Sequence, residues 1–257
     1  MKSIKTILFK ILSLQNYLRL LHKSFHFLYA INFLKNDPIY KYHYFDKKII
    51  RKGDYIIDLG ANLGYYTILF AKWTGKTGKV YAVEPVSYFA NTIKWASKNY
   101  ENIELYPYAL GNEEKEVTMG TPDKFGYLRT GLLHVIEKDD NDSPHEFAFK
   151  AQMKKGSVLF KNIPRLDFIK CDIEGYEEFV LPEMAEVLMK FKPIIQLETW
   201  GKHKANVEKF LVEMGYEIYN LEDNIIKPLN ETKNNEPGDL FFIHKNNKPA
   251  LERIQNI

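Results

Sequence analysis

The chain has 257 residues, of which 45% are hydrophobic and 27% are charged, and its formal net charge is +3. This composition is typical of a globular protein with a sizeable core, and the length fits one large α/β domain with additions. The weakly basic balance lacks the clustered positive charge of nucleic-acid-binding proteins, so we expect no nucleic-acid partner. A single cysteine, Cys171, excludes an intrachain disulfide and indicates a buried thiol in a reducing, cytoplasmic compartment.

The N-terminal segment, residues 1–45, is expected to form a basic, amphipathic helical extension. Residues 1–36 contain lysine and arginine but no acidic residue, and their apolar residues recur at helical spacing. Charges interrupt every apolar run, so neither a transmembrane helix nor a cleaved signal peptide is expected. Three interpretations remain: a helix packed on the domain as a cap or homodimer element, peripheral contact of residues 1–34 with an anionic membrane, or a weak targeting segment.

The main domain is expected to span residues 46–245, because strand-like and helix-like segments alternate there. The first half predicts, in chain order, the strand Tyr55–Leu59, a helix at 64–73, the strand Lys79–Glu84, a helix at 86–99, the strand Ile103–Tyr108 and a short strand at 116–119. Residues 120–164 interrupt this alternation and contain only one further strand-like run. We therefore expect a loop-rich insertion, of the kind that is more often functional than idle, near an acceptor site.

The second half continues the alternation. It predicts a strand within 165–175, a helix to about residue 191, the strand Pro193–Thr199, a helix at 202–214, strands at 216–221 and 240–244, and a peripheral tail at 246–257. This order is typical of a Rossmann-like α/β fold. The expected architecture is a seven-stranded, mostly parallel sheet with helices on both faces.

The loop after the first strand, Gly60-Ala61-Asn62-Leu63-Gly64-Tyr65, resembles a dinucleotide-binding turn but fails its pattern. Asn62 and Tyr65 stand where glycines would let the backbone approach a pyrophosphate, and no G-K-[ST] follows, so NAD, FAD and the P-loop are disfavoured. Glu84, at the end of the second strand, suits the two ribose hydroxyls of an adenosine. Together with Asp58 and the turn, which suit a short zwitterionic tail, it favours S-adenosylmethionine.

Four stretches together resemble the FkbM family of S-adenosylmethionine-dependent methyltransferases, over about Lys52 to Leu221. They are "DLGANLGYYTILFAK", "VYAVEP", "ELYPYALGNEEKEVTM" and "LDFIKCDIEGYEEFVL". The K-x-D-x-E-G element at 170–175 is the most specific of these signals. The resemblance implies the class I methyltransferase fold, an enzyme, and a hydroxyl on a glycan or small natural product as acceptor.

The resemblance also implies positions for the cofactor. Asp58, Gly60, Asn62 and Gly64 would line it, and Glu84 would bind the ribose. The region of Tyr108 and Ala109 would lie near the adenine, and Asp172 is a further candidate for contact with the methionine tail.

The candidate catalytic residues follow the fourth and fifth strands, where ligands of doubly wound sheets bind. A hydroxyl acceptor has to lose a proton, and Asp172 is the first candidate for the base, Glu174 the second. Helix capping is the competing role for both carboxylates. His203 is a third candidate, with a solvated turn histidine as its alternative.

No metal site is predicted from spacing, although Asp172, Glu174 and Glu198 are carboxylates of the kind that hold a divalent cation. Two other functions remain as alternatives to O-methylation: N-methylation, and a binding module that keeps the fold without catalysis. The sequence lacks the Asn/Asp-Pro-Pro-aromatic element expected for N-methylation, and it retains the cofactor residues expected to be lost in a binding module.

Overall fold

A computed structural model describes residues 4–122, 127–136, 145–198, 204–231 and 238–255. Within these ranges, eight strands form one sheet in the order β11-β10-β12-β9-β8-β1-β2-β3. Their bounds are β1 Tyr55–Leu59, β2 Lys79–Val83, β3 Ile103–Tyr106, β8 Phe168–Cys171, β9 Ile194–Leu197, β10 Tyr216–Glu222, β11 Ile225–Pro228 and β12 Leu240–His244.

Five neighbouring strands, β9, β8, β1, β2 and β3, run parallel, whereas β12, β10 and β11 are antiparallel. The predicted fold class is confirmed, but the described sheet has one strand more than the seven expected. The additional strand, β11, pairs with β10 through a tight turn at Asp223 and Asn224. Both residues have positive φ, 53° and 60°, as a type I′ hairpin turn requires, and Asp and Asn adopt it at low cost.

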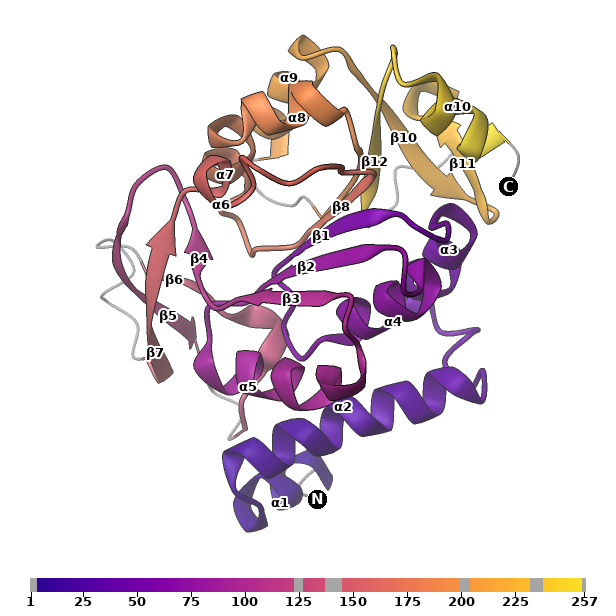
Figure 1. Cartoon of the computed structure of the whole chain (residues 1–257). Coiled ribbons are helices and arrows are strands. Elements are labelled where there is room, and N and C mark those ends of the chain that lie inside the picture. Colours follow the sequence, from indigo (N-terminus) through magenta and orange to yellow (C-terminus); the bar gives the residue numbers. More distant parts are fainter. Residues whose placement is uncertain (1–3, 123–126, 137–144, 199–203, 232–237, 256–257) are drawn as a thin grey trace.

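Helices cover both faces of the sheet (Figure 1). On one face lie α3 Lys41–Ile49, α4 Tyr65–Thr74 and α5 Ser87–Ala96, and on the other α7 Glu177–Glu183, α8 Ala185–Phe191 and α9 Lys204–Glu213. The parallel strands are buried on both sides, which explains why they read as continuous apolar runs. One exception stands out: Lys170 in β8 is 2% exposed.

A second sheet of four strands, in the order β4-β7-β5-β6, stands beside the first. It consists of β4 Ala109–Leu110, β5 Lys115–Pro122, β6 His134–Val135 and β7 His145–Lys154, and β7 leads into the short helix α6 Gly156–Leu159. The short strand predicted at 116–119 is the centre of β5, and the strand-like run in the insertion is β7. The described part of 120–164 therefore contributes a sheet, and residues 137–144 lie outside the description.

The N-terminal segment forms α1 Ile4–Ile11 and α2 Leu14–Ala30. Helix α2 packs along α5 and near α4 (Figure 1). It buries Tyr17, Leu18, His22 and Phe25, and its His22 Nδ1 lies 2.7 Å from the Leu63 carbonyl in the loop after β1. The extension is thus joined to the domain directly behind the glycine turn.

The expectation of a peripheral tail is not met. Residues Lys248–Gln255 form α10, which buries Ala250, Arg253 and Ile254. Arg253 donates to the buried carboxylate of Asp54 at 2.7 and 3.2 Å. This ion pair fixes the tail to the residue that precedes β1.

Candidate active site

A cavity of about 690 Å³, including its open mouth, lies beyond the carboxyl ends of β1, β2 and β8. Ligands of open α/β sheets bind at this edge. The main sheet contributes Leu59, Gly60, Asn62, 83–86, 172–174 and Tyr176, and Phe89 of α5 adds to this wall. The opposite wall comes from 108–110, Met119, Thr130, Gly131, Leu133 and Val135. The cavity is thus enclosed between the main sheet and the second sheet.

Gly60 is required where β1 ends because the loop after β8 lies directly against it. Its φ is +76°, and a Cβ at this position would lie 1.8 Å from the carbonyl oxygen of Asp172. No side chain fits at that distance. The glycine therefore brings the turn after β1 into backbone contact with the loop that carries the candidate catalytic carboxylates.

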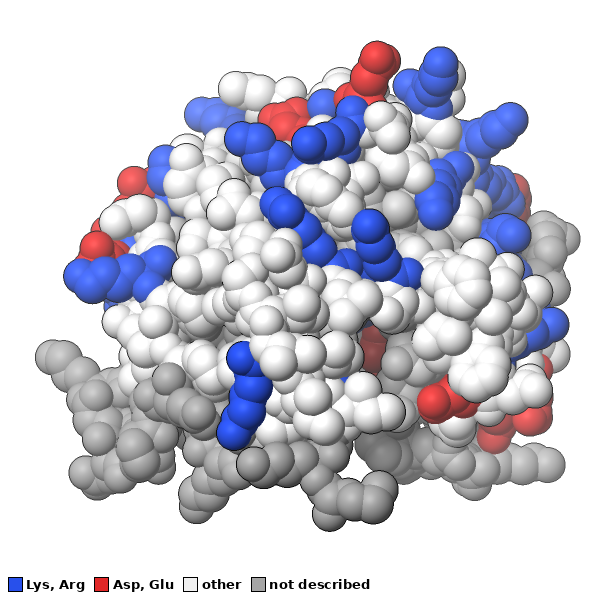
Figure 2. Space-filling view, turned by 90° about the horizontal axis from the view of Figure 1, so that it is seen from below, with Lys and Arg blue, Asp and Glu red and all other residues white. Residues whose placement is uncertain are grey.

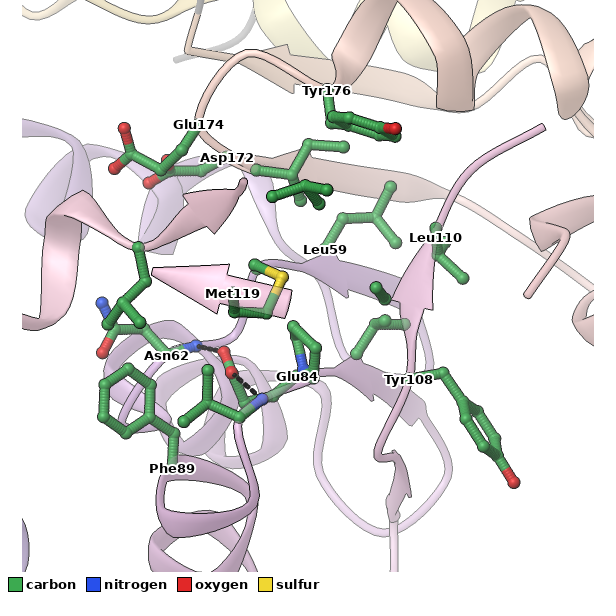
Figure 3. A pocket seen from close by; sticks show the side chains of 18 of the residues that line it. Leu59, Asn62, Glu84, Phe89, Tyr108, Leu110, Met119, Asp172, Glu174 and Tyr176 are labelled. Atoms are coloured by element: carbon green, nitrogen blue, oxygen red, sulfur yellow. Dashed lines mark hydrogen bonds between the residues drawn. The ribbon is translucent and has the colours of Figure 1, made fainter. Parts of the chain in front are cut away.

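Glu84 is held at the base of the cavity by two backbone donors (Figure 3). Its Oε2 accepts from the N–H of Asn62 at 2.7 Å, and its Oε1 accepts from the N–H of Val86 at 2.8 Å. Burial raises the pKa of Glu84 to about 8, although both hydrogen bonds act in the opposite direction. Each carboxylate oxygen keeps a free lone pair, so this fixed group can bind a diol as well.

Asn62 has an unused acceptor at the cavity wall. Its φ is +51°, in the left-handed region that asparagine tolerates. The amide Nδ2 donates to the Thr130 carbonyl at 3.1 Å, whereas the buried Oδ1 has no hydrogen-bond partner among the described residues. An orphaned buried acceptor destabilises the protein unless a ligand or a water donates to it. It fits the ammonium group of a methionine tail.

Asp58 and Gly64 do not belong to the residues that line this cavity. Asp58 is buried behind the turn and accepts from the Thr67 hydroxyl at 2.5 Å, which fixes the first turns of α4. Burial raises its pKa to about 6. Gly64 begins α4 with φ +79°, and a Cβ there would lie 3.1 Å from Ile93 of α5. Both residues shape the turn from behind, and direct contact with the cofactor stays a prediction.

Ala109 lies at the opposite end of the cavity, in β4 of the second sheet, and is buried. Tyr108 lines the same wall, and Figure 3 shows its side chain directed away from the centre of the cavity. Ala109 and Leu110 make this end apolar, as suits an adenine ring.

Asp172 and Glu174 lie together at one side of the cavity, beyond the end of β8 (Figure 3). Glu174 has φ +54°, an uncommon conformation for a residue other than glycine. Burial, followed by the nearby Asp172 and Glu198 carboxylates, raises the pKa of Glu174 to about 8. Burial and then Asp172 raise the pKa of Glu198 to about 8 as well. The geometry therefore places three carboxyl groups close together, two of which hold their protons near neutral pH.

Lys170 supplies the positive charge beneath these carboxyl groups. Its Nζ lies 3.3 Å from Asp172 Oδ2 and 3.6 Å from Asp239 Oδ2, the latter just before β12. Burial alone would lower the pKa of this ammonium, but Asp172 and Asp239 outweigh it and raise the pKa above its ordinary value. Gln196 of β9 also donates to Asp239, at 2.7 Å. Lys170 is thus a permanently charged group that orients Asp172.

The capping role considered for Asp172 and Glu174 is not seen at the helix that follows them. Helix α7 begins at Glu177 without a side-chain cap. The Glu177 carboxylate reaches back and accepts from the N–H of Ile173 at 3.0 Å. It thereby holds the loop that presents Asp172 and Glu174 to the cavity.

His203 lies outside the described residues, so its role stays a prediction. Glu198, at the end of β9, lies close enough to Asp172 for this carboxylate to raise the pKa of Glu198. Among the residues that the structure describes, no group of three or more histidine, cysteine or acidic side chains has a geometry that would hold a metal ion.

The apolar wall of the second sheet is the part of the site that sequence reasoning missed. Met119, Leu133 and Val135 line the cavity, and the Asn62–Thr130 hydrogen bond closes the wall over the glycine turn. Alternation along "EVTMG" was a usable signal, because Val117 and Met119 share one face of β5. Residues 130–133 carry no such pattern.

Comparison with known proteins places this fold among the class I methyltransferases. The family model described as "Methyltransferase FkbM domain" matches residues 58–218. The structure is similar to that of a methyltransferase FkbM from Methylobacillus flagellatus, with a TM-score of 0.50 and 14% identity over 74% of this chain. The match covers 43% of the Methylobacillus chain, so the present chain spans less than half of it. No curated protein matches.

Two further solved structures are similar at lower scores. One is an S-adenosylmethionine-dependent O-methyltransferase from Thermotoga maritima, with 13% identity, coverage of 80% of this chain and 65% of that chain, and a TM-score of 0.43. The other is fibrillarin from Aeropyrum pernix in complex with natively bound S-adenosylmethionine, with 10% identity, coverage of 75% and 66%, and a TM-score of 0.42.

The chain belongs to the FkbM methyltransferase family, because the family model covers more than half of it. The predicted family, the class I fold, the enzyme class and the cofactor S-adenosylmethionine are thereby confirmed. The cavity fits this cofactor chemically. Glu84 is a fixed diol acceptor, Asn62 Oδ1 is an acceptor in need of a donor, and the wall at Ala109 is apolar.

Proposed function

We propose that the protein is an O-methyltransferase that methylates a hydroxyl group of a glycan or of a small natural product. The observation that carries this proposal is the group of Asp172, Glu174 and Glu198 beside Lys170 at the ends of β8 and β9. A hydroxyl is a poor nucleophile until its proton is removed, and a carboxyl group with a pKa near the working pH is a suitable base.

We propose the following roles in binding the cofactor. Glu84 binds the ribose hydroxyls, Asn62 and the Gly60 turn hold the methionine part, and the Ala109 wall contacts the adenine. Asp58 acts through Thr67 and α4. When bound, S-adenosylmethionine supplies an electrophilic methyl group on a positively charged sulfur.

The acceptor proton goes to a carboxylate of the Asp172–Glu174 pair. Lys170 pairs with Asp172 and orients it, so Asp172 accepts a hydrogen bond from the incoming hydroxyl and positions it. Glu174, with its pKa near 8, exchanges protons readily near neutral pH and is the partner that passes the proton to solvent. His203 stays a candidate for the base that removes the acceptor proton. The cluster also offers several acceptors and donors for the hydroxyls of a sugar or polyol.

We place the reaction in a cytoplasmic compartment. The support is the chain's one cysteine, Cys171, which is buried in β8 and has no cysteine partner.

The test compares Asp172→Asn and Glu174→Gln with Glu186→Gln, an exposed position on α8 that serves as the matched control. The assay measures affinity for S-adenosylhomocysteine by calorimetry and single-turnover methyl transfer to a panel of glycans and hydroxylated natural products. Loss of the proton acceptor is expected to slow transfer by about 10²–10⁴-fold while cofactor affinity is retained.

The other possible outcomes would assign different roles to these carboxylates or contradict O-methylation. An unchanged rate in both variants removes the pair from the mechanism. Equal losses of rate and of cofactor affinity assign Asp172 to the methionine tail instead. Transfer to amines but never to hydroxyls contradicts O-methylation, and cofactor binding without transfer to any acceptor indicates a binding module.

A further inference from the structure

We propose that the face formed by α1, α2 and the segment up to residue 39 docks on the surface of an anionic lipid bilayer. This inference is independent of the acceptor proposed above. Among the described residues, none of the helices has the length and apolar character needed to cross a bilayer. The contact proposed here is therefore peripheral, with apolar side chains inserted at the level of the headgroups.

The first observation is a set of large apolar side chains that this face leaves in solvent. Helix α1 buries no residue, and its Ile4 and Ile11 are 76% and 70% exposed. The exposed set continues along α2 and beyond it. Its members are Ile4, Ile7, Ile11, Leu20, Phe27, Ile31, Phe33 and Ile39. In the whole described chain the other exposed large apolar residues number five and are scattered over separate elements: Tyr88, Val158, Met189, Val212 and Ile225.

The apolar residues form a stripe on α2 opposite its packed face. Leu20, Phe27 and Ile31 follow a spacing that keeps them on one side of the helix, whereas Tyr17, Leu18 and Phe25 face the domain. The outer side of α2 thus exposes large apolar residues among polar ones such as Asn16 and Lys23, whereas its inner side is packed on the domain.

The second observation is the predominance of positive charge on the same segment. Residues 4–36 carry no aspartate or glutamate, and Asp37 is the one acidic residue between Ile4 and Ile39. Their basic residues are Lys5, Lys10, Arg19, Lys23 and Lys35. Seen from the side of α1 and α2, the molecule has a broad area without charged side chains (Figure 2). Lys and Arg lie mostly in the upper half of this view, and the acidic side chains are fewer and lie mostly towards the edges. The charge matches anionic headgroups, each basic residue adding about a fivefold preference.

The position of this face relative to the active site supports the same partner. A second hollow lies beneath α1 and α2, lined by Lys5, Tyr17 and Leu21 from the extension, and it shares Thr130 and Gly131 with the cofactor cavity. A bilayer bound at α1 would thus lie next to an opening that adjoins the reaction site. A second copy of the chain is disfavoured as the occupant, because two such faces would bring like charges together.

The experiment uses the full chain and two kinds of vesicle, one of phosphatidylcholine alone and one of equal parts phosphatidylcholine and phosphatidylglycerol. Co-sedimentation is expected with the anionic vesicles at low salt and not with the neutral ones. It should weaken strongly in about 1 M salt, where the screening length is about 3 Å.

Two sets of variants separate the contributions, each with a matched control. Ile4→Ser with Ile7→Ser and Ile11→Ser should weaken partitioning by at least about 100-fold, since each buried isoleucine contributes roughly a factor of ten. The control set is Val158→Ser, Val212→Ser and Ile225→Ser, which removes exposed apolar residues elsewhere.

Lys5→Glu with Lys10→Glu should weaken partitioning by at least about 25-fold. Its control is Lys245→Glu with Lys248→Glu, which makes the same change in net charge beside α10. Affinity for S-adenosylhomocysteine is measured on every variant to confirm folding.

Three results would overturn the proposal. One is failure of the unmodified chain to bind anionic vesicles at low salt. Another is binding that survives the isoleucine and lysine variants, or that falls equally in the controls. The third is a dimer in light scattering that the isoleucine variants abolish, which would assign the face to a second copy. If the isoleucine set misfolds, the lysine pair and the salt dependence decide alone.

Discussion

Replacing Gly60 with alanine tests the contact that joins the cofactor turn to the candidate catalytic loop. The new methyl group would lie 1.8 Å from the Asp172 carbonyl oxygen and 2.8 Å from its carbonyl carbon. Non-bonded heavy atoms normally stay about 3.5 Å apart, so one backbone segment has to move by roughly 1.5 Å. Both of these Asp172 atoms belong to the backbone, so the rotation of a side chain cannot relieve the clash.

The expected loss of stability follows from two contributions. The left-handed φ of +76° costs about 1–2 kcal/mol for alanine. Displacement of the loop also weakens the bonds from Gly60 N to Val83 O and from Asp172 N to Leu59 O, both 3.1 Å, at about 1 kcal/mol each. The total expected for Gly60→Ala is therefore about 3–4 kcal/mol, the sum of these contributions.

The matched control is Gly75→Ala. Gly75 also has a positive φ, +66°, but a Cβ there meets no atom within 4 Å. Its ψ of −172° places it in a region that is almost restricted to glycine, so only a conformational cost applies, about 1–3 kcal/mol. The difference between the two variants isolates the steric contact.

The assay is urea unfolding followed by circular dichroism, together with calorimetry of S-adenosylhomocysteine binding. Gly60→Ala should be the less stable variant and should bind the cofactor product weakly, whereas Gly75→Ala should bind it like the unmodified protein. If Gly60→Ala loses no more stability than Gly75→Ala, the backbone contact with Asp172 is absent and the reasoning fails.

Two further predictions concern buried charge. Because burial raises the pKa of Glu84, Glu174 and Glu198 to about 8, the folded protein keeps protons that the unfolded chain releases above about pH 4.5. The cofactor-free protein should therefore lose stability as the pH rises from about 4.5 to about 8, and the loss should level off above that. The part of this range between about pH 7 and 8 lies above the ordinary titration of histidine, and Glu84→Gln should flatten the slope there. A urea midpoint that rises over this range would contradict the prediction. Arg253→Ala leaves the Asp54 carboxylate buried without its bidentate partner, so stability should fall by about 3 kcal/mol with cofactor affinity unchanged. Equal unfolding midpoints for Arg253→Ala and the unmodified protein would show that α10 is not anchored by this pair.

The main sheet was predictable because its signals are local. Strands such as Tyr55–Leu59 and Lys79–Val83 are mostly apolar runs bounded by turn residues. A strand that is buried on both faces needs apolar residues along its whole length, so it can be recognised in the sequence. Strand β11 was missed because Ile225–Pro228 is short and ends in a lysine and a proline. Its signal was the turn, since Asp223 and Asn224 suit a type I′ hairpin.

The parts that sequence reasoning missed depend on contacts between distant segments. The tail reads as a short polar helix, and its anchoring needs Asp54, almost two hundred residues earlier. The cofactor turn shows the same limit. The glycine pattern predicted a role for Gly60 and Gly64 alike, whereas in the fold Gly60 meets the Asp172 loop and Gly64 meets α5. Spacing alone does not separate a residue that lines a site from one that supports it.

The pairing of Lys170 with Asp239 has a consequence for synthesis of the protein on the ribosome. Domains tend to fold as their N-terminal parts emerge, but Lys170 enters the centre of the sheet long before Asp239 and β12 are translated. Until then its ammonium group has one of its two carboxylate partners, and β9 lacks its neighbour on one side. The surroundings of Lys170 and the pairing of β9 are therefore completed only by β12, the last described strand in chain order.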